Sequence, residues 1–148
     1  MEEIEHYRNV LKALKERGFT VMLTLWHFTL PKWVADKEGW ENGATVKYFE
    51  RFVKRIVPRL AEYVDLWVTL NEPGVYVFQT YIEGIWPPAK KSLIGQVKTF
   101  LNLTSAHRKV YKYLHATFPA GKPVGIANNI LSFESYHKHS LVEQIAVS

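Results

Sequence analysis

Apolar and polar positions along the chain follow two alternating patterns, one helical and one typical of buried strands. Residues 3 to 17 place apolar side chains three and four positions apart with charged residues between them, which predicts an amphipathic helix. The same spacing predicts helices over about residues 45 to 63 and 93 to 118. Residues 75 to 92 begin as a helix and continue as an aromatic-rich loop, whose aromatic side chains either pack inward or face a ligand.

Residues with special backbone preferences predict the ends of these helices. Gly18 ends the first helix, and either Asn42 or Thr45 caps the second. Pro58 interrupts the second helix and is expected to kink it. The tail from 133 to 148 has a weak helical pattern. Because the first helix begins almost at residue 1, with no cap and no preceding strand, we expect further chain upstream.

Three short apolar runs between the helices predict buried strands. They cover residues 19 to 26, 66 to 70 and 124 to 127 and are rich in residues that favour strands. None alternates between apolar and polar residues, which is typical of parallel strands covered on both faces. A strand, a helix and the next strand form a βαβ unit whose crossover should be right-handed. The sequence therefore predicts an α/β fold with a parallel sheet.

Each predicted strand is followed by polar side chains. His27 follows the first strand, Asn71 and Glu72 follow the second, and Asn128 follows the third. Pro73 has no N–H for a strand ladder and disfavours helical geometry at Glu72, so regular pairing should stop there. Parallel strands bring these polar groups to one rim, where α/β folds place their ligands. The plain alternative is that Asn-Glu-Pro is only a polar turn leaving a strand.

The choice of α/β fold is between an open doubly wound sheet and a (β/α)8 barrel. No Gly-x-Gly-x-x-Gly or phosphate-binding loop follows any strand, which favours the barrel. A barrel has eight strands and about 250 residues, whereas this chain has 148 residues and three predicted strands. We therefore predict that residues 1 to 148 form a single, incomplete TIM-barrel segment.

Composition narrows the function classes. The chain is 47% hydrophobic and 22% charged, as in soluble globular proteins, and has no long apolar run or basic leader, so we predict a cytoplasmic protein without a membrane span. With no cysteine it has neither disulfides nor thiolate metal sites, and we expect no metal or other cofactor. The net charge of +5 comes from basic residues at helical spacings, which favours solvated helix faces over a nucleic-acid partner.

Three stretches together resemble a known family. They are Leu25-Trp26-His27-Phe28-Thr29-Leu30-Pro31-Lys32-Trp33, followed by Gly39-Trp40-Glu41-Asn42, and Thr69-Leu70-Asn71-Glu72-Pro73. Their order and spacing are similar to those of the retaining β-glycosidases of glycoside hydrolase family 1, especially thermophilic archaeal members. The resemblance runs over essentially the whole chain and implies the third to fifth strands of the family's barrel.

The resemblance implies roles for three residues. Glu72 would be the catalytic acid/base, Asn71 the amide that binds the sugar 2-hydroxyl, and His27 the imidazole that binds a hydroxyl of the non-reducing sugar. A retaining glycosidase needs one carboxylic acid to protonate the leaving oxygen and a second carboxylate about 5–5.5 Å away as nucleophile. The first must still be protonated at the working pH, which an apolar setting or a nearby negative charge provides. His107 is implied to be structural, in agreement with its place on the apolar stripe of its helix.

The resemblance also shows what the chain lacks. The family's nucleophile block, Thr-Glu-Asn-Gly, is absent, and no other carboxylate is placed to replace it. We predict a β-glycosidase segment that carries the acid/base half of the site, acts on β-linked glucosides, galactosides, mannosides or oligosaccharides, and is inactive alone. The alternative is a noncatalytic partial-barrel module. In either case the open sheet predicts self-association or assembly with the remaining barrel segments.

Overall fold

The computed structural model describes residues 2–118 and 121–130, together with a few positions of the tail: Glu134, Tyr136, His137, Ser140, Val142 and Ile145. The predicted weak helix of the tail falls mostly outside the described residues. In chain order the elements are α1 (Glu2–Glu16), β1 (Met22–Thr24), α2 (Lys32–Ala35), η1 (Gly39–Glu41), α3 (Ala44–Leu60), η2 (Ala61–Tyr63), β2 (Leu66–Asn71), α4 (Pro73–Val77), the π-helical turn η3 (Phe78–Ile82), α5 (Leu93–Thr117) and β3 (Val124–Ala127).

The described strands form one parallel sheet in the order β1-β2-β3, which confirms the predicted α/β arrangement. β2 lies in the centre, where Trp67 is in register with Leu23 on one side and with Val124 on the other. Residues in register point to the same face of a sheet. Leu23, Trp67 and Val124 therefore share one face, and both of Trp67's partners pack against the buried core.

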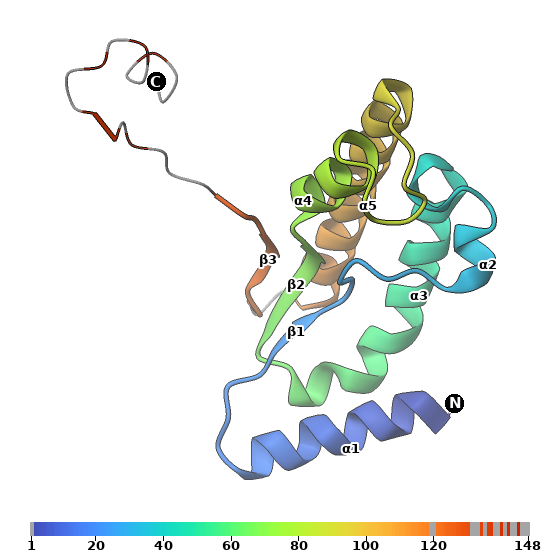
Figure 1. The fold of residues 1–148 in the computed structure, drawn as a ribbon. Helices are drawn as coiled ribbons and strands as arrows, with labels where there is room; N and C mark the ends of the chain where they lie inside the picture. The colour runs from blue at the N-terminus through green and yellow to red at the C-terminus, as the bar shows by residue number, and fades with distance from the viewer. Residues whose placement is uncertain are drawn as a thin grey trace.

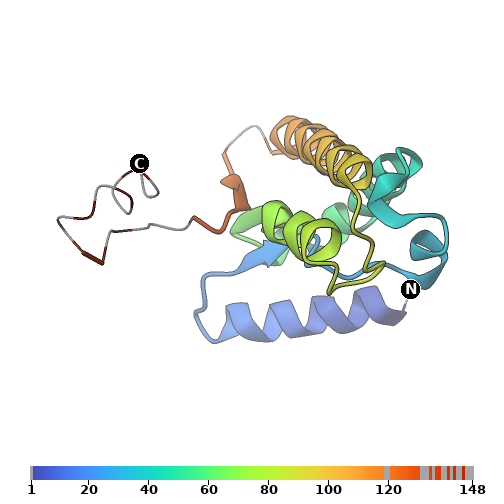
Figure 2. The ribbon, with the colours of Figure 1, turned by 45° about the horizontal axis from the view of Figure 1, so that its top comes forward.

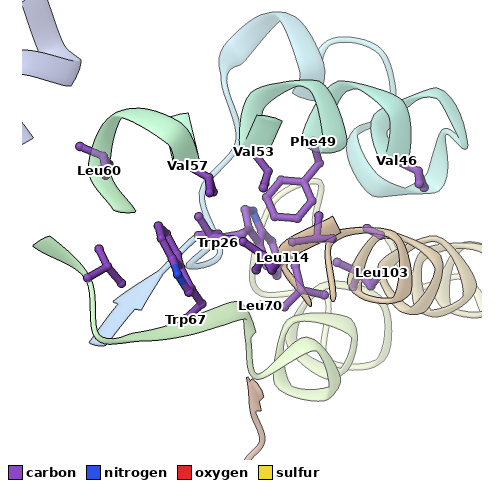
Figure 3. Packing of buried hydrophobic residues seen from close by; sticks show 14 of the residues in the cluster. Trp26, Val46, Phe49, Val53, Val57, Leu60, Trp67, Leu70, Leu103 and Leu114 are labelled. Atoms are coloured by element: carbon purple, nitrogen blue, oxygen red, sulfur yellow. The ribbon is translucent and has the colours of Figure 1, made fainter. Parts of the chain in front are cut away.

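The helices lie against this face of the sheet. Figure 1 shows α3 and α5 side by side next to the strands, and α1 running below them. Figure 2 turns the same ribbon and brings α4 and α5 to the front. In Figure 3, Phe49, Val53 and Val57 of α3 point toward Trp67 of β2 and Leu114 of α5. These side chains are almost completely buried and form the core.

Several predicted boundaries are corrected by the structure. β1 is limited to Met22–Thr24, shorter than the predicted run from 19 to 26, although Leu25 and Trp26 remain buried and still hydrogen-bond the backbone of β2. Asn42 does bind the start of α3, since its Oδ1 accepts the N–H of Ala44 at 2.9 Å. Thr45 is not the cap, because its hydroxyl donates to the carbonyl of Gly39 instead.

The opposite face of the sheet is open in the described part of the chain. Met22 is in register with Leu66, and Val68 with Gly125, so these four residues share the face away from α3 and α5. Met22 is 62% exposed, and a hollow of about 320 Å³ runs along this face. In a closed barrel the side chains on such a face would point into the barrel interior and fill it. The sheet is therefore built as one part of a larger closed surface.

Gly95 lets α5 pack closely against the turn η3. A Cβ on Gly95 would lie 2.7 Å from Cε1 of Tyr81, a ring that is only 3% exposed and has no room to move. We expect Gly95→Ala to lower the melting temperature by several degrees, the effect of about 1–3 kcal/mol of overpacking, although alanine normally favours helices.

The matched control is Gly74→Ala in α4, where an added Cβ meets nothing within 4 Å. This variant should melt at or slightly above the wild-type temperature. Thermal unfolding followed by circular dichroism compares the two, and equal behaviour of both variants would show that the contact between α5 and Tyr81 is not tight.

Candidate functional site

Three of the four residues predicted for the rim lie where β1 and β2 end. Asn71 is the last residue of β2, Glu72 follows it, and His27 lies three residues beyond the end of β1. Nδ2 of Asn71 is 3.4 Å from Nε2 of His27. Asn71 and Glu72 are half-buried and His27 is exposed, so all three groups are within reach of a ligand. The structure therefore brings the side chains of Asn71 and His27 into contact and places Glu72 next to Asn71 in the chain, while Asn128 lies exposed beyond the end of β3.

Backbone hydrogen bonds hold Asn71 and Glu72 from both sides. The N–H of Asn71 donates to the carbonyl of Trp26 at 3.0 Å, and the N–H of Glu72 donates to the carbonyl of Ala127 at 2.8 Å. Just before these two residues, the pairing of β2 with β3 shifts register by a bulge that lies between Val68 and Asn71. Bulges re-aim side chains next to active sites. The two residues are thus anchored to the neighbouring strands on opposite sides.

Glu72 has a left-handed backbone conformation, with φ 41° and ψ 58°. A residue with a Cβ adopts this conformation at a cost of about 1–3 kcal/mol, and such strain concentrates at active sites and ligand-binding positions. The conformation is held by the bond to Ala127 and by the carbonyl of Glu72, which accepts the N–H of Tyr76 at 3.1 Å. Pro73 then begins α4, which confirms that pairing stops at this point.

The turn that presents His27 is also strained. Phe28 has φ 67°, and the N–H of Thr29 donates to the carbonyl of His27 at 2.8 Å, which closes a γ-turn of the rare positive-φ kind. Nε1 of Trp26, a ring only 6% exposed, donates to the carbonyl of Thr29 at 2.8 Å. A buried indole therefore fixes the turn from below, and the imidazole is directed outward.

An aromatic hollow adjoins these groups. It has a volume of about 590 Å³ and is lined by Phe28, Thr29, Leu30, Ala35, Asp36, Glu38, Gly39, Tyr76, Trp86, Pro87 and Pro88. The Phe28 ring lies 4.9 Å from the His27 ring and 4.8 Å from the Trp86 ring, measured between centroids. Burial raises the pKa of Tyr76, so its hydroxyl stays neutral at ordinary pH. Tyr76 and Trp86 of the predicted aromatic segment both line the hollow, and both also pack on the buried core.

An ion pair ties the two loops around the hollow. Nζ of Lys90 donates to both carboxylate oxygens of Glu41 at 2.9 and 3.0 Å, and the Glu41 side chain is only 9% exposed. This pair joins η1 to the loop that precedes α5. The sequence did not predict it, because the partners are 49 positions apart and nothing local distinguishes them from other charged loop residues.

His107 supports the end of β2 from the helix layer. Its Nδ1 lies 2.7 Å from Oγ1 of Thr69, whose hydroxyl also lies 3.2 Å from the carbonyl of Gly125. The two contacts are compatible when Nδ1 donates to Thr69 and Thr69 donates to Gly125. The ring is therefore part of the packing, as its place on the apolar stripe of α5 predicted, and it links α5 to β2 and β3 directly below the rim.

Burial lowers the pKa of His107 below its usual value, which gives a pH prediction. The unfolded chain then binds more protons than the folded chain between the ordinary histidine pKa of about 6.5 and the lowered one. Stability from neutral His107 is present above that window and should fall as the pH is lowered through it. Melting temperatures at several pH values should show a weaker decline for His107→Gln, while His115→Gln, an exposed position on the same helix, should keep the wild-type decline.

Asp65 lies at the other end of β2 and has a different role. Its carboxylate accepts Nζ of Lys15 at 2.8 and 2.9 Å and the N–H of Val21 at 2.7 Å. The lysine, and after it the backbone N–H, hold the pKa of Asp65 below its ordinary value. Residues at the amino end of a barrel strand usually stabilise the fold, whereas catalytic residues lie at the carboxyl end. Asp65 links α1, β1 and β2 at the amino end of β2, opposite the rim.

No three His, Asp or Glu side chains of the described part converge as metal ligands would. No helix among those residues is long and apolar enough to cross a membrane.

Comparison with known proteins decides the family. The sequence profile of Glycosyl hydrolase family 1 matches residues 1–145. The chain belongs to this family. The described fold is accordingly a segment of a (β/α)8 barrel, with α3, α5 and the strands in the arrangement of the family's solved structures.

Individual relatives show the extent of the similarity. Galactolipid galactosyltransferase SFR2 of Arabidopsis thaliana is 36% identical over 146 residues, which are 91% of this chain and 24% of that protein. Beta-glucosidase A of Acetivibrio thermocellus is 34% identical over 134 residues, which are 90% of this chain and 29% of that protein. The solved β-glycosidase of Pyrococcus horikoshii matches with a TM-score of 0.83 and 33% identity over 93% of this chain and 31% of its own. The chain thus spans between a quarter and a third of the length of these relatives.

Proposed function

We propose that this chain supplies the acid/base half of a β-glycosidase active site with a retaining mechanism. The observation that carries the proposal is the contact of 3.4 Å between Asn71 and His27, with Glu72 next in the chain and anchored to β3 at the same rim. An amide, an imidazole and a carboxyl group at one end of parallel strands match what a sugar ring needs: hydrogen bonds to its hydroxyls and a proton for its leaving oxygen.

The chemistry assigns each group a step. Glu72 gives its proton to the glycosidic oxygen as the bond to the anomeric carbon breaks, and in the second step it removes a proton from the attacking water. Asn71 binds the 2-hydroxyl, a contact that strengthens in the transition state. His27 binds another hydroxyl and fixes the orientation of the ring. The carboxylate nucleophile, about 5–5.5 Å from the acid, comes from another part of the barrel.

The acceptor in the second step is a separate question. The Arabidopsis relative is named a galactosyltransferase and the bacterial relatives are named β-glucosidases. An acid/base residue serves equally when water or a sugar hydroxyl attacks, because both must lose a proton. We infer that hydrolysis is the primary activity and that glycosyl transfer is the second candidate. Analysis of the products formed in the presence of an added sugar acceptor distinguishes these two activities.

A chimeric enzyme tests the proposal. Residues 1–145 replace the matching segment of the Pyrococcus horikoshii β-glycosidase, so that the remaining barrel comes from an active relative. Asn71→Ala and His27→Ala should each lower kcat/KM for an aryl β-glucoside by about 10- to 100-fold, the loss of one hydrogen bond that is used in the transition state. The melting temperature should change little because both side chains lie on the rim.

Matched controls are Asn9→Ala and His6→Ala, which remove the same side chains from the exposed surface of α1. They should retain full kcat/KM. If Asn71→Ala and His27→Ala behave like these two, the sugar-binding roles are wrong.

The same proposal predicts how the chain behaves alone. Among the described residues, β1 and β3 are the unpaired edges of the sheet, and Met22 on the open face is 62% exposed. Unpaired edges and exposed apolar faces favour association. We expect a polypeptide of these 148 residues to form oligomers or aggregates at micromolar concentration. Sedimentation equilibrium measures this, and a stable 17.2 kDa monomer with a sharp cooperative melt would contradict it.

A further inference from the structure

We propose that the ion pair between Glu41 and Lys90 positions His27 for sugar binding. The pair holds the loop before α5 against η1, and the rings of Trp86 and Phe28 carry this constraint to the imidazole. The inference rests on the proposed function, because that function gives His27 its role. It adds Glu41 and Lys90 to the site as positioning residues.

Glu41 is a fixed anchor for this pair. Its side chain is only 9% exposed, and a Cβ added to Gly95 in the first turn of α5 would lie 3.2 Å from its Cδ. Its backbone carbonyl accepts Nδ2 of Asn102 at 3.3 Å. A nearly buried carboxylate needs a partner, and the first turn of a helix favours negative charge. Lys90 is the cation that the structure pairs with it, at 2.9 and 3.0 Å.

The loop that carries Lys90 is mostly exposed. From 85 to 91, every residue except Trp86 is exposed. Backbone bonds tie the loop to η3, since the N–H of Trp86 donates to the carbonyl of Gln79 and the N–H of Lys90 donates to that of Thr80, both at 3.2 Å. Loops with few buried contacts open at a low free-energy cost. The ion pair joins this loop to η1, so its loss should let the loop move away from η1.

Trp86 connects the loop to the sugar-binding imidazole. The Phe28 ring contacts the indoles of Trp86 and Trp26, with centroids 4.8 and 6.1 Å away, and the His27 ring at 4.9 Å. Trp26 is 6% exposed and belongs to the core, so Trp86 on the exposed loop is the indole that can move. A strained turn such as that at Phe28 persists only where surrounding contacts hold it. Release of Trp86 should therefore loosen the imidazole.

NMR of the chimeric enzyme with labelled histidines reads this position directly. The ring Cε1–H signal of His27, assigned by its loss in His27→Ala, senses the neighbouring Phe28 ring. Lys90→Met and Glu41→Gln should each shift or broaden this signal. Lys90→Arg should keep the wild-type signal, because a guanidinium binds both oxygens of a carboxylate. An unchanged signal in Lys90→Met would overturn the proposal.

Lys32→Met is the matched control. Lys32 pairs with Asp36 at 2.8 Å, but the two residues are exposed and lie one helical turn apart, so this pair joins no second element. The variant removes a lysine and an ion pair near the same hollow, and it should leave both the His27 signal and kcat/KM unchanged. If it acts like Lys90→Met, the loss of a surface charge explains the effect and the positioning role is wrong.

A double-mutant cycle measures the consequence for catalysis. The substrate is methyl β-glucoside, whose aglycone is too small to fill the hollow. Lys90→Met should lower kcat/KM by about 3- to 10-fold, a typical coupling between a site and a residue that acts through others. In a His27→Ala background the same change should cost less than about twofold, because the imidazole that it positions is gone. Equal losses in both backgrounds would refute positioning through His27.

The two readouts separate this inference from the proposed function. A large loss in His27→Ala together with wild-type behaviour of Lys90→Met refutes the positioning role alone. A His27 signal that moves in Lys90→Met, in an enzyme that is insensitive to His27→Ala, refutes the sugar-binding role of His27 and the catalytic effect of the ion pair with it. That result leaves the pair as a contact that only holds the imidazole in place.

Discussion

In the chimeric enzyme, Glu72→Ala is expected to slow hydrolysis of alkyl β-glucosides by about 10²–10⁴-fold, the usual contribution of general acid catalysis. Hydrolysis of dinitrophenyl β-glucosides should show a much smaller loss in its first step. An alkoxide is a poor leaving group and needs the proton of Glu72, whereas dinitrophenolate leaves readily without one. The dependence on the leaving group is therefore the signature of an acid at this position.

Burst and steady-state kinetics measure the two steps separately. In the variant, the glycosyl-enzyme should accumulate with the dinitrophenyl substrate, because no base activates water. Sodium azide, which attacks without losing a proton, should restore turnover and give a glycosyl azide. Glu83→Ala removes an exposed carboxylate of the neighbouring loop and serves as the control. A loss of the same size for both substrates would show that Glu72 is not the acid.

The chain alone is expected to have no measurable glycosidase activity. A retaining mechanism needs two carboxyl groups, and the deletion of one of two cooperating catalytic residues removes nearly all the benefit of the pair. At the rim, the described residues provide Glu72 but no second carboxyl group that the sequence identifies as the nucleophile. Incubation with an aryl β-glucoside at several protein concentrations measures this.

Adding the remaining barrel in trans should restore activity. A separately produced polypeptide that carries the other strands of a family relative would cover the open edges of β1 and β3 and bring the nucleophile. The restored activity should disappear with Glu72→Gln. Robust turnover by the chain alone that Glu72→Gln abolishes would show instead that a nucleophile is present within it.

The order of elements and the position of the rim were predictable because both depend on local patterns. Apolar periodicity separated helices from strands, and the end of each strand was marked by a polar residue or a proline. The parallel arrangement then placed His27, Asn71 and Glu72 at one rim without any knowledge of contacts. Pro73 was sufficient to end the pairing of β2, because it has no N–H to donate.

Features that depend on distant partners were not predictable. The left-handed conformation of Glu72 is imposed by the bond to Ala127, which is 55 positions later in the chain, as the two residue numbers show. The γ-turn at Phe28 depends on the indole of Trp26, whose burial is decided by the rings around it. The ion pair of Glu41 with Lys90 joins two loops whose sequences carry no signal of each other. Tertiary contacts select these conformations against local preference.

The ion pair of Lys15 with Asp65 affects how the sequence of this segment can evolve. It holds β2 at the amino end, and the proposed acid/base residue and its neighbour Asn71 lie at the carboxyl end of the same strand. Substitutions at separated sites with no shared partners have nearly additive effects on stability. Mutations of Asn71 or His27 therefore have little effect on the contacts that hold the amino end of β2. The sugar-binding side chains of this segment can therefore change during evolution with little effect on its stability.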